Sequence, residues 1–306
     1  MRTGAKARFL AALGLWIAIG PAPLAKVAAQ GEGDAGGFSA KTTTEPVMRV
    51  SRVVEASTSA AADAATARHS LDPALQLAYE GLDRMRSGIH DYTATLVKRE
   101  RIDGRLSDEE FIQLKIRNAR VRDGLGQVPF SIYLRFLRPT SCEGREVIWV
   151  DGRNDGKLVA HDTGVIRGQF RVSLDPEGGL AMKGNRYPIY EAGIENLVVR
   201  LIEKANRDRA AGDCRVSFRN AKVGDRECTK ITVQHDERRH PYDFHIAEVF
   251  IDKELGIPIR YAAYTWPRRP DEEPILEEEY TYTNVRLNVG LTDRDFDPDN
   301  PAYAFP

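Results

Sequence analysis

Strand-length runs in which apolar and polar residues alternate fill most of the sequence after residue 91, and this alternation constrains the fold more than any other feature. A period of two places successive side chains on opposite faces of a strand, and Gly, Asp and Pro turns separate the runs at the short spacings of an antiparallel meander. We expect strands at residues 92–101, 110–121, 130–137, 145–150, 157–161, 165–174, 215–220, 228–235, 245–252, 257–266 and 275–288.

Two helices are predicted beside these strands. Asp72 is suited to cap the first one, Pro73 fits its first position, and apolar residues at helical spacing follow as far as Gly88. A second apolar stripe at helical spacing covers residues 191–206. About eleven strands and two main helices in this order predict an α+β fold, mainly antiparallel β, in which the helices cover one face of a strongly curved sheet.

The two faces of residues 130–137 differ in polarity. The apolar face consists of Phe130, Ile132, Leu134 and Phe136. The other face, which we expect to contact water, consists of Ser131, Tyr133 and Arg135. A curved sheet of this size under two short helices either fills its concave side with side chains or leaves a cavity there. If a cavity exists, the four apolar residues are predicted to line it.

The first 29 residues have the three regions of a secretory signal. Basic residues precede an unbroken apolar run at residues 9–19, and Gly20 and Pro21 end it before small residues that finish at Ala29. The alternative is a membrane anchor, but eleven apolar residues span only about 16 Å as a helix, roughly half of the hydrocarbon core. We therefore expect cleavage after Ala29 and a soluble mature protein in the periplasm or cell envelope.

Residues 30–70 are dominated by Ala, Ser, Thr and Gly, which predicts a disordered linker because so few large apolar residues cannot offset the entropy of ordering. Residues 71–306 are expected to form one globular domain. Removal of residues 1–29 takes four of the 44 basic residues and none of the 45 acids, so the mature net charge is −5. This charge does not favour nucleic acid as a partner.

The chain has three cysteines, too few for a disulfide scaffold. The first is Cys142, so no cysteine near the cleavage point is available for lipid attachment. Export permits one disulfide, for which Cys214 and Cys228 are the natural pair. The alternative is three isolated small hydrophobic residues.

The motifs for catalysis, cofactors and metals that we considered are each incomplete or absent in the sequence. Residues 152–157 resemble a phosphate loop but are one residue short between the glycines, and a hairpin turn is the better interpretation. The sequence lacks a Gly-x-Ser-x-Gly elbow and a His-Glu-x-x-His helix. Two clusters remain, and for both we prefer another interpretation over a metal site: solvated or hydrogen-bonded histidines beside a loop, and a terminal tail with solvated acids. They are the histidines His235, His240 and His245, and the terminal acids Asp293, Asp295, Asp297 and Asp299.

An acidic run at residues 277–279 lies inside a predicted strand. Its middle member, Glu278, shares a strand face with Tyr280 and Tyr282, which makes it a candidate for a buried polar anchor. The alternative is a solvated edge strand, because charge discourages pairing between sheet edges.

Four segments carry a resemblance to a known family: residues 144–152, 154–161, 184–194 and 248–260. They resemble an exported bacterial family of unknown function, domain of unknown function 1571, and the resemblance extends from about residue 71 to 305. Its most distinctive residues are Asn185, Arg186 and Tyr187. A structural interpretation accompanies them, in which Pro188 fixes a turn before the second helix and Arg186 satisfies carbonyls or an acid of that turn.

More distantly, residues 252–260 and 282–291 resemble the lipoprotein carriers LolA and LolB. That resemblance implies an incomplete antiparallel barrel with helices as a lid over an apolar cavity for acyl chains. It also implies a carrier without enzymatic activity. The carriers' functional arginine matches no position here, so no binding residue is transferred.

These observations lead to one main hypothesis and two alternatives. The main hypothesis is a non-enzymatic periplasmic protein, without cofactor or metal, that shelters a lipid or the acyl chains of a lipoprotein and contacts the membrane or envelope proteins transiently. The first alternative is an envelope scaffold whose concave face is solid core and whose outer surface binds protein. The second is a hydrolase built on Asp, Glu and His.

Overall fold

The computed structural model describes residues 69–122, 126–164 and 167–306. The predicted signal at residues 1–29 lies outside these residues, as does the predicted linker at 30–70 apart from its last two residues. No helix within the described part of the chain is both long and apolar enough to span a membrane. The helices are α1 (Asp72–Gly88), α2 (Ile194–Ala211) and the short 3-10 helices η1 (Asn154–Gly156), η2 (Arg167–Gln169), η3 (Ile189–Glu191) and η4 (Asp293–Phe296).

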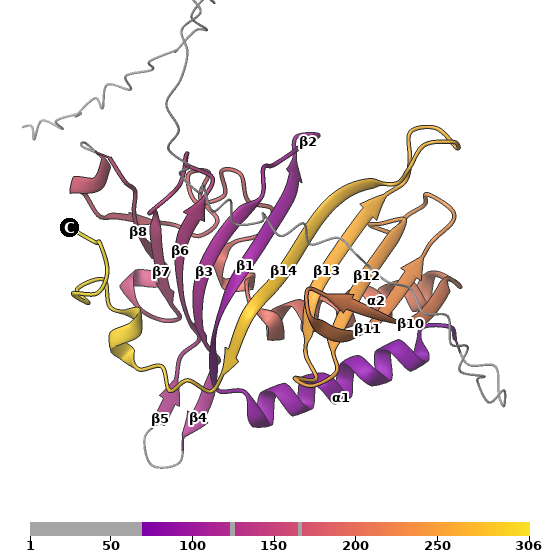
Figure 1. Cartoon of the computed structure of the whole chain (residues 1–306), viewed down its shortest axis with the longest axis horizontal. Coiled ribbons are helices and arrows are strands. Elements are labelled where there is room, and N and C mark those ends of the chain that lie inside the picture. The colour runs from indigo at the N-terminus through magenta and orange to yellow at the C-terminus, as the bar shows by residue number, and fades with distance from the viewer. Residues whose placement is uncertain (1–68, 123–125, 165–166) are drawn as a thin grey trace, which may run out of the picture. The chain divides into compact units, whose positions relative to one another are not determined.

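Eleven strands form one antiparallel path, shown in Figure 1. In sheet order they are β10 (Arg215–Val223), β11 (Arg226–Gln234), β12 (Ile246–Asp252), β13 (Pro258–Thr265), β14 (Ile275–Leu287), β1 (Asp91–Ile102), β3 (Glu110–Arg117), β6 (Ser131–Arg138), β7 (Glu146–Val150), β8 (Leu158–His161) and β9 (Val172–Leu174). A short strand, β2 (Arg105–Leu106), pairs with β1, while β4 (Arg120–Arg122) and β5 (Gly126–Val128) form a separate hairpin. Because β10 and β9 do not pair, the sheet stays open, which confirms the predicted half-open α+β barrel.

The inner face of the sheet carries the main hydrophobic core. Alternate residues of β1 point to this face, where Tyr92, Ala94 and Leu96 are buried. Both α-helices add apolar side chains to the same core, and in Figure 1 they lie beside the half of the sheet that contains β10 to β14. The alternation seen in the sequence therefore decides which side chains face the helices.

Helix α2 begins where the backbone approaches the sheet closely. Gly193 has a φ of 113°, which is strained for any other residue, and a Cβ atom there would lie 3.2 Å from Ile116 Cδ1 and 3.3 Å from the Tyr92 hydroxyl, so these neighbours would have to move. The Tyr92 hydroxyl accepts a 2.8 Å hydrogen bond from the backbone N–H of Ile194. The helix predicted at residues 191–206 therefore starts later than expected.

The C-terminal segment, defined here as residues 289–306, covers part of the outer face of the sheet. Tyr303 stacks on Tyr133 of β6 with ring centroids 4.2 Å apart. Phe296 is only 2% exposed and packs with Ile148 and Val150 of β7. A second, smaller core therefore lies on the face that the sequence pattern assigned to water.

The prediction that Ser131, Tyr133 and Arg135 face water is thus wrong for two of the three. Ser131 and Tyr133 are buried, and only Arg135 is exposed. The Ser131 hydroxyl accepts a 2.9 Å hydrogen bond from Arg117 Nη2, and the Tyr133 hydroxyl donates a 2.6 Å hydrogen bond to Glu146. These polar groups are tolerated inside because each has a partner.

Two of the terminal acids hold the C-terminal segment to the sheet. Asp293 is exposed, as predicted for a solvated acid, whereas Asp295 is half-buried, so the prediction is wrong for Asp295. Asp293 accepts a 2.7 Å hydrogen bond from Arg117, and Asp295 accepts a 2.8 Å hydrogen bond from Lys115. The bond from Arg117 lowers the pKa of Asp293. Burial acts to raise the pKa of Asp295, but the bonds from Lys115 and Thr292 outweigh it and the pKa is lowered.

Acid is expected to loosen the C-terminal segment. Because the folded state lowers the pKa of both aspartates, their ion pairs stabilise it fully above the ordinary value of 3.8, and this contribution is lost as the pH falls through the lowered values. NMR signals of Tyr303 should therefore change below about pH 3.8. A variant with Asp293→Asn and Asp295→Asn should lose most of this dependence, and an unchanged acid response in that variant contradicts the assignment.

The three cysteines are all free thiols. Cys228 pairs with Ala221 near one end of the β10–β11 ladder, whereas Cys214 directly precedes Arg215 at the other end. Six residues of extended strand separate the two ends by roughly 20 Å, far beyond the roughly 7 Å that a disulfide spans between Cα atoms. The proposed Cys214–Cys228 pair is therefore wrong, and the alternative of isolated cysteines holds.

Candidate functional site

A cavity of about 700 Å³ lies on the inner face of the sheet. The segment between β9 and α2, residues 175–193, borders it and is called the cover loop below. Strands β1, β3, β6, β7, β8, β9, β13 and β14 line it, and α2 adds Leu197, Arg200, Leu201 and Lys204. The volume falls within the roughly 300–1,000 Å³ of small-molecule sites. The inner face is thus only partly filled by side chains.

The floor of the cavity is a continuous apolar row that crosses the sheet. In the strand register Leu114 pairs with Leu134, Leu134 with Val147, Val147 with Ala160, and Ala160 with Val172. All five residues border the cavity. Because paired residues point to the same face, one register row gives the cavity an apolar floor from β3 to the edge strand β9.

The four residues predicted to line a cavity divide into two pairs. Leu134 and Phe136 border it, as expected. Ile132 is completely buried in the core beside the cavity, where it pairs with Ile116. Phe130 packs against Trp149, with ring centroids 6.0 Å apart, and does not line the cavity. A binding role for these residues remains a prediction.

Two carboxylates, Glu100 and Glu278, lie together in the wall of the cavity. They face each other directly in the β1–β14 register, and each is 3% exposed. Like charges in such positions repel unless other groups compensate them. The Tyr280 hydroxyl donates to Glu100 Oε1 at 2.6 Å, and the Tyr261 hydroxyl donates to Glu278 Oε1 at 3.2 Å. The remaining oxygen of each carboxylate is bound by the cover loop.

The cover loop is anchored to these carboxylates by the residues that are most distinctive in the sequence. The backbone N–H of Arg186 donates to Glu100 Oε2 at 3.0 Å, and its Nε lies 3.3 Å from Glu278 Oε2. The Tyr187 hydroxyl donates to Glu278 Oε2 at 2.7 Å. Asn185 Oδ1 accepts a 2.7 Å hydrogen bond from Lys98 Nζ. Arg186 also donates to the carbonyl of residue 101 at 3.0 Å. The structural interpretation of Arg186 therefore holds for the kind of partner, carbonyls and acids, but these partners belong to β1 and β14 and not to the turn before α2.

The environment fixes the protonation states of this anchor. Burial and the charge of Glu278 raise the pKa of Tyr187 and Tyr280 above the ordinary value of 10, and burial raises that of Tyr261 as well. Desolvation acts to lower the pKa of Arg186, but Glu278, Tyr187 and Glu277 together outweigh it, so that pKa is raised. The tyrosines therefore stay hydrogen-bond donors and Arg186 stays charged at neutral pH.

The position of Glu278 confirms one prediction and rejects its alternative. It is a buried polar anchor, and β14 lies between β13 and β1 rather than at an edge. Two partners were missed, Lys98 and Glu100. The alternation of β1 places both on the face of Leu96, which borders the same cavity, so the signal was present in the sequence.

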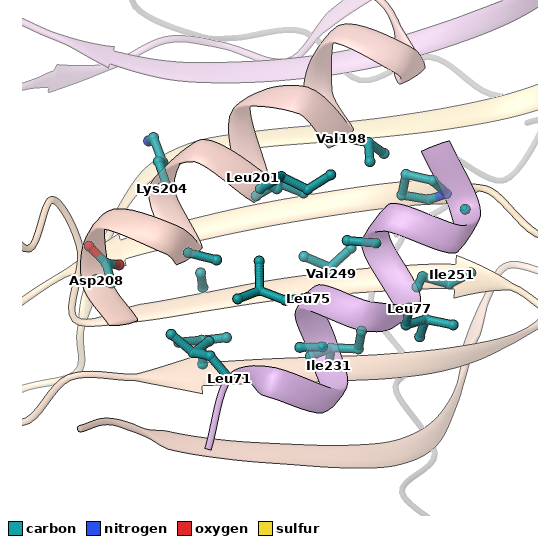
Figure 2. A pocket seen from close by; sticks show the side chains of 18 of the residues that line it. Leu71, Leu75, Leu77, Val198, Leu201, Lys204, Asp208, Ile231, Val249 and Ile251 are labelled. Carbon is teal, nitrogen blue, oxygen red and sulfur yellow. The ribbon is translucent and has the colours of Figure 1, made fainter. Parts of the chain in front are cut away.

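A second, smaller pocket of about 100 Å³ lies between α1, α2 and strands β11 to β13 (Figure 2). Figure 2 shows Leu75 of α1 and Val198 of α2 on either side of it and Ile231 on the strands, and Asp208 lies at one end. Leu201 borders both this pocket and the large cavity. Helix α2 therefore borders both the large cavity and the smaller pocket.

The three histidines do not assemble a metal site. His235 is buried with Nε2 3.1 Å from Asp208 Oδ2, and its ring stacks on Tyr242. His245 Nδ1 lies 2.6 Å from the carbonyl oxygen of His235, and His240 is exposed. Within the described ranges no group of three His, Cys, Asp or Glu side chains is placed to hold a metal ion.

The solved structures to which this chain is similar share little sequence with it. A putative outer membrane lipoprotein-sorting protein domain from Vibrio parahaemolyticus is 14% identical, with a TM-score of 0.35, over 73% of this chain and 95% of that one. A LolA superfamily protein from Nitrosomonas europaea is 13% identical, with a TM-score of 0.29, over 76% and 98%. The Pseudomonas aeruginosa MucA/MucB complex is 17% identical, with a TM-score of 0.37, over 72% of this chain and 60% of that one.

The amino-acid sequence was also compared with curated proteins and with protein families. No curated protein matches it. Residues 89–305, however, match the family described as protein of unknown function (DUF1571). This match covers most of the chain and includes the cavity floor, the cover loop and both carboxylates of the anchor. The protein therefore belongs to the DUF1571 family, as the resemblance of its four segments implied.

Proposed function

We propose that this domain is a non-enzymatic binding protein of the cell envelope that holds the acyl chain of a lipid or lipoprotein in the 700 Å³ cavity. The observation that carries the proposal is the apolar register row from Leu114 to Val172, which forms a floor without a charged residue along its length. Such a floor is complementary to an alkyl chain and offers nothing to a polar solute. The export signal predicted at residues 1–29 supports the location.

The arrangement of the acids supports binding rather than hydrolysis. All four carboxylate oxygens of Glu100 and Glu278 already accept hydrogen bonds. The donors to Glu100 are the Tyr280 hydroxyl and the backbone N–H of Arg186. The donors to Glu278 are the hydroxyls of Tyr261 and Tyr187. A general acid or base needs an oxygen within reach of the substrate. Because their oxygens are already bound by internal donors, the two acids hold the cover loop against the sheet.

Filling the cavity is expected to block binding. Ala160→Trp places a large side chain on the cavity floor, whereas Val159→Trp places one on the opposite face of β8 and serves as the matched control. We expect Ala160→Trp to weaken binding of a fluorescent long-chain fatty acid by at least about tenfold, or about 1.4 kcal/mol, and Val159→Trp to leave it nearly unchanged.

Native mass spectrometry of the protein purified from its own host provides the direct test. We expect bound species whose masses correspond to lipids or acylated peptides, and their loss in Ala160→Trp. A wild-type protein that carries no lipid and does not take up the fatty acid contradicts the proposal. Equal binding by both tryptophan variants contradicts the assigned position of the chain.

A further inference from the structure

The mouth of the cavity has an apolar rim. Three of the large hydrophobic side chains that remain exposed border the cavity: Phe170 at 61%, Val172 at 45% and Leu180 at 75%. They come from two segments, the first two from the approach to β9 and β9 itself, the third from the cover loop. A soluble domain gains nothing from such a cluster by itself, and clustered exposed apolar groups mark surfaces that contact something.

The rim is the continuation of the cavity floor. Val172 pairs with Ala160 in the β8–β9 register, and Ala160 pairs with Val147. Along this row the side chains pass from the buried Val147, through the half-buried Ala160, to the exposed Val172 without a polar interruption. An alkyl chain that enters over Val172 therefore has an apolar register row along the sheet side of its path.

The charged side chains beside the rim differ in whether they have a hydrogen-bond or ion-pair partner. Arg171 is bound to Asp299 at 2.5 Å, Asp175 accepts from the backbone N–H of Glu177, and Glu177 accepts from the Tyr190 hydroxyl. Lys183 is exposed, borders the cavity and makes no ion pair with any residue in the described part of the chain. A free lysine three residues after an exposed leucine is the combination found at membrane interfaces, where the ammonium group reaches the headgroups.

We infer that this rim, formed by Phe170, Val172 and Leu180 with Lys183 beside them, docks on a phospholipid bilayer and that acyl chains pass across it into the cavity. The inference rests on the proposed function. A protein partner is less well matched, because a stable protein interface takes about 20–30 residues from each side and the rim offers three apolar ones. A bilayer needs only a few inserted side chains, and it holds the alkyl chains that the floor row fits.

The test uses the wild-type protein and two variants with vesicles of phosphatidylethanolamine and phosphatidylglycerol. The rim variant carries Phe170→Ser and Leu180→Ser, and the control carries Val121→Ser and Phe218→Ser, which are exposed apolar residues that do not border the cavity. We expect the rim variant to lose at least about tenfold in vesicle affinity, since burial of one Phe or Leu accounts for more than that factor, and the control to bind like the wild type.

Binding of a monomeric fluorescent fatty acid from free solution separates this inference from the proposed function. The rim variant should lose far less of that affinity than of its vesicle affinity, because the floor row from Leu114 to Val172 is unchanged, and it should take up the fatty acid from vesicles more slowly. If the wild type binds the fatty acid but not the vesicles, or if the rim variant binds vesicles as well as the control does, the rim inference fails alone. If no form binds the fatty acid, the proposed function itself fails.

Discussion

Glu278→Ala should lower the free energy of unfolding by about 3–5 kcal/mol, the cost of removing one partner from a buried charged network. Glu278 is 3% exposed and accepts hydrogen bonds from the hydroxyls of Tyr187 and Tyr261, while Arg186 lies 3.3 Å from it. Alanine leaves the hydroxyls of Tyr187 and Tyr261 without this acceptor, and an unsatisfied buried donor costs more than its hydrogen bond contributes. Urea denaturation of the wild type and the variant measures the difference.

A matched control separates the buried network from charge in general. Glu227 lies on β11, pairs with Lys222 and is exposed, so Glu227→Ala should change the stability little. Glu278→Gln keeps the size of the side chain but not its charge, so we expect a loss between those of the two alanine variants. Equal stability of Glu278→Ala and Glu227→Ala contradicts the anchor.

The effect of Glu278→Ala should also be local. Arg186 and Tyr187 attach the cover loop to the sheet through this carboxylate, and Asn185 keeps its own bond to Lys98. Hydrogen exchange should therefore rise in residues 186–193 more than in the strands far from the cavity. If exchange rises uniformly over the sheet instead, the carboxylate stabilises the fold as a whole and does not hold the loop specifically.

Local patterns were sufficient to predict the elements of this fold, because each depends on a period that neighbouring residues carry. The first helix ends at Gly88, as its spacing indicates, and ten of the eleven predicted strands are present over most of their length. The strand predicted at residues 165–174 is wrong over Arg167–Gln169, which form η2, and only Val172–Leu174 is strand. The boundaries of α2 shifted to Ile194 and Ala211 because Gly193 and Gly212 have φ values of 113° and 148°. Glycine conformation depends on contacts from the sheet, such as the approach of Tyr92, and these are not local.

The parts of the site that sequence missed depend on pairs far apart in the chain. Glu100 and Glu278 become neighbours only when β1 pairs with β14, and Arg186 reaches both from a third segment. The alternation of side chains along a strand predicted which face Glu278 is on but not which residues it contacts. Likewise, a cavity on the inner face depends on how much of the concave side the helices and the cover loop fill, which alternation does not encode.

The packing of the outer face also depends on residues far apart in the chain, and its loss is the second large effect on stability that we expect. Phe296→Ala is expected to cost about 3–5 kcal/mol, the usual loss for truncating a buried phenylalanine. The ring is 2% exposed among Tyr133, Ile148 and Val150, and the Arg117 guanidinium lies 4.9 Å from its centroid. Alternation assigned this face to water because the covering segment is distant in sequence and rich in aspartate.

The form of the urea transition shows whether the C-terminal segment unfolds with the sheet or before it. If the segment is an integral part of the fold, Phe296→Ala shifts the midpoint without changing the slope, because the same surface is exposed on unfolding. A smaller slope means that the segment has already detached in the variant and uncovered Tyr133. Phe218→Ala, at an exposed site on the edge strand β10, is the control and should shift the midpoint little. Equal effects of the two substitutions contradict the packing of Phe296 on the sheet in solution.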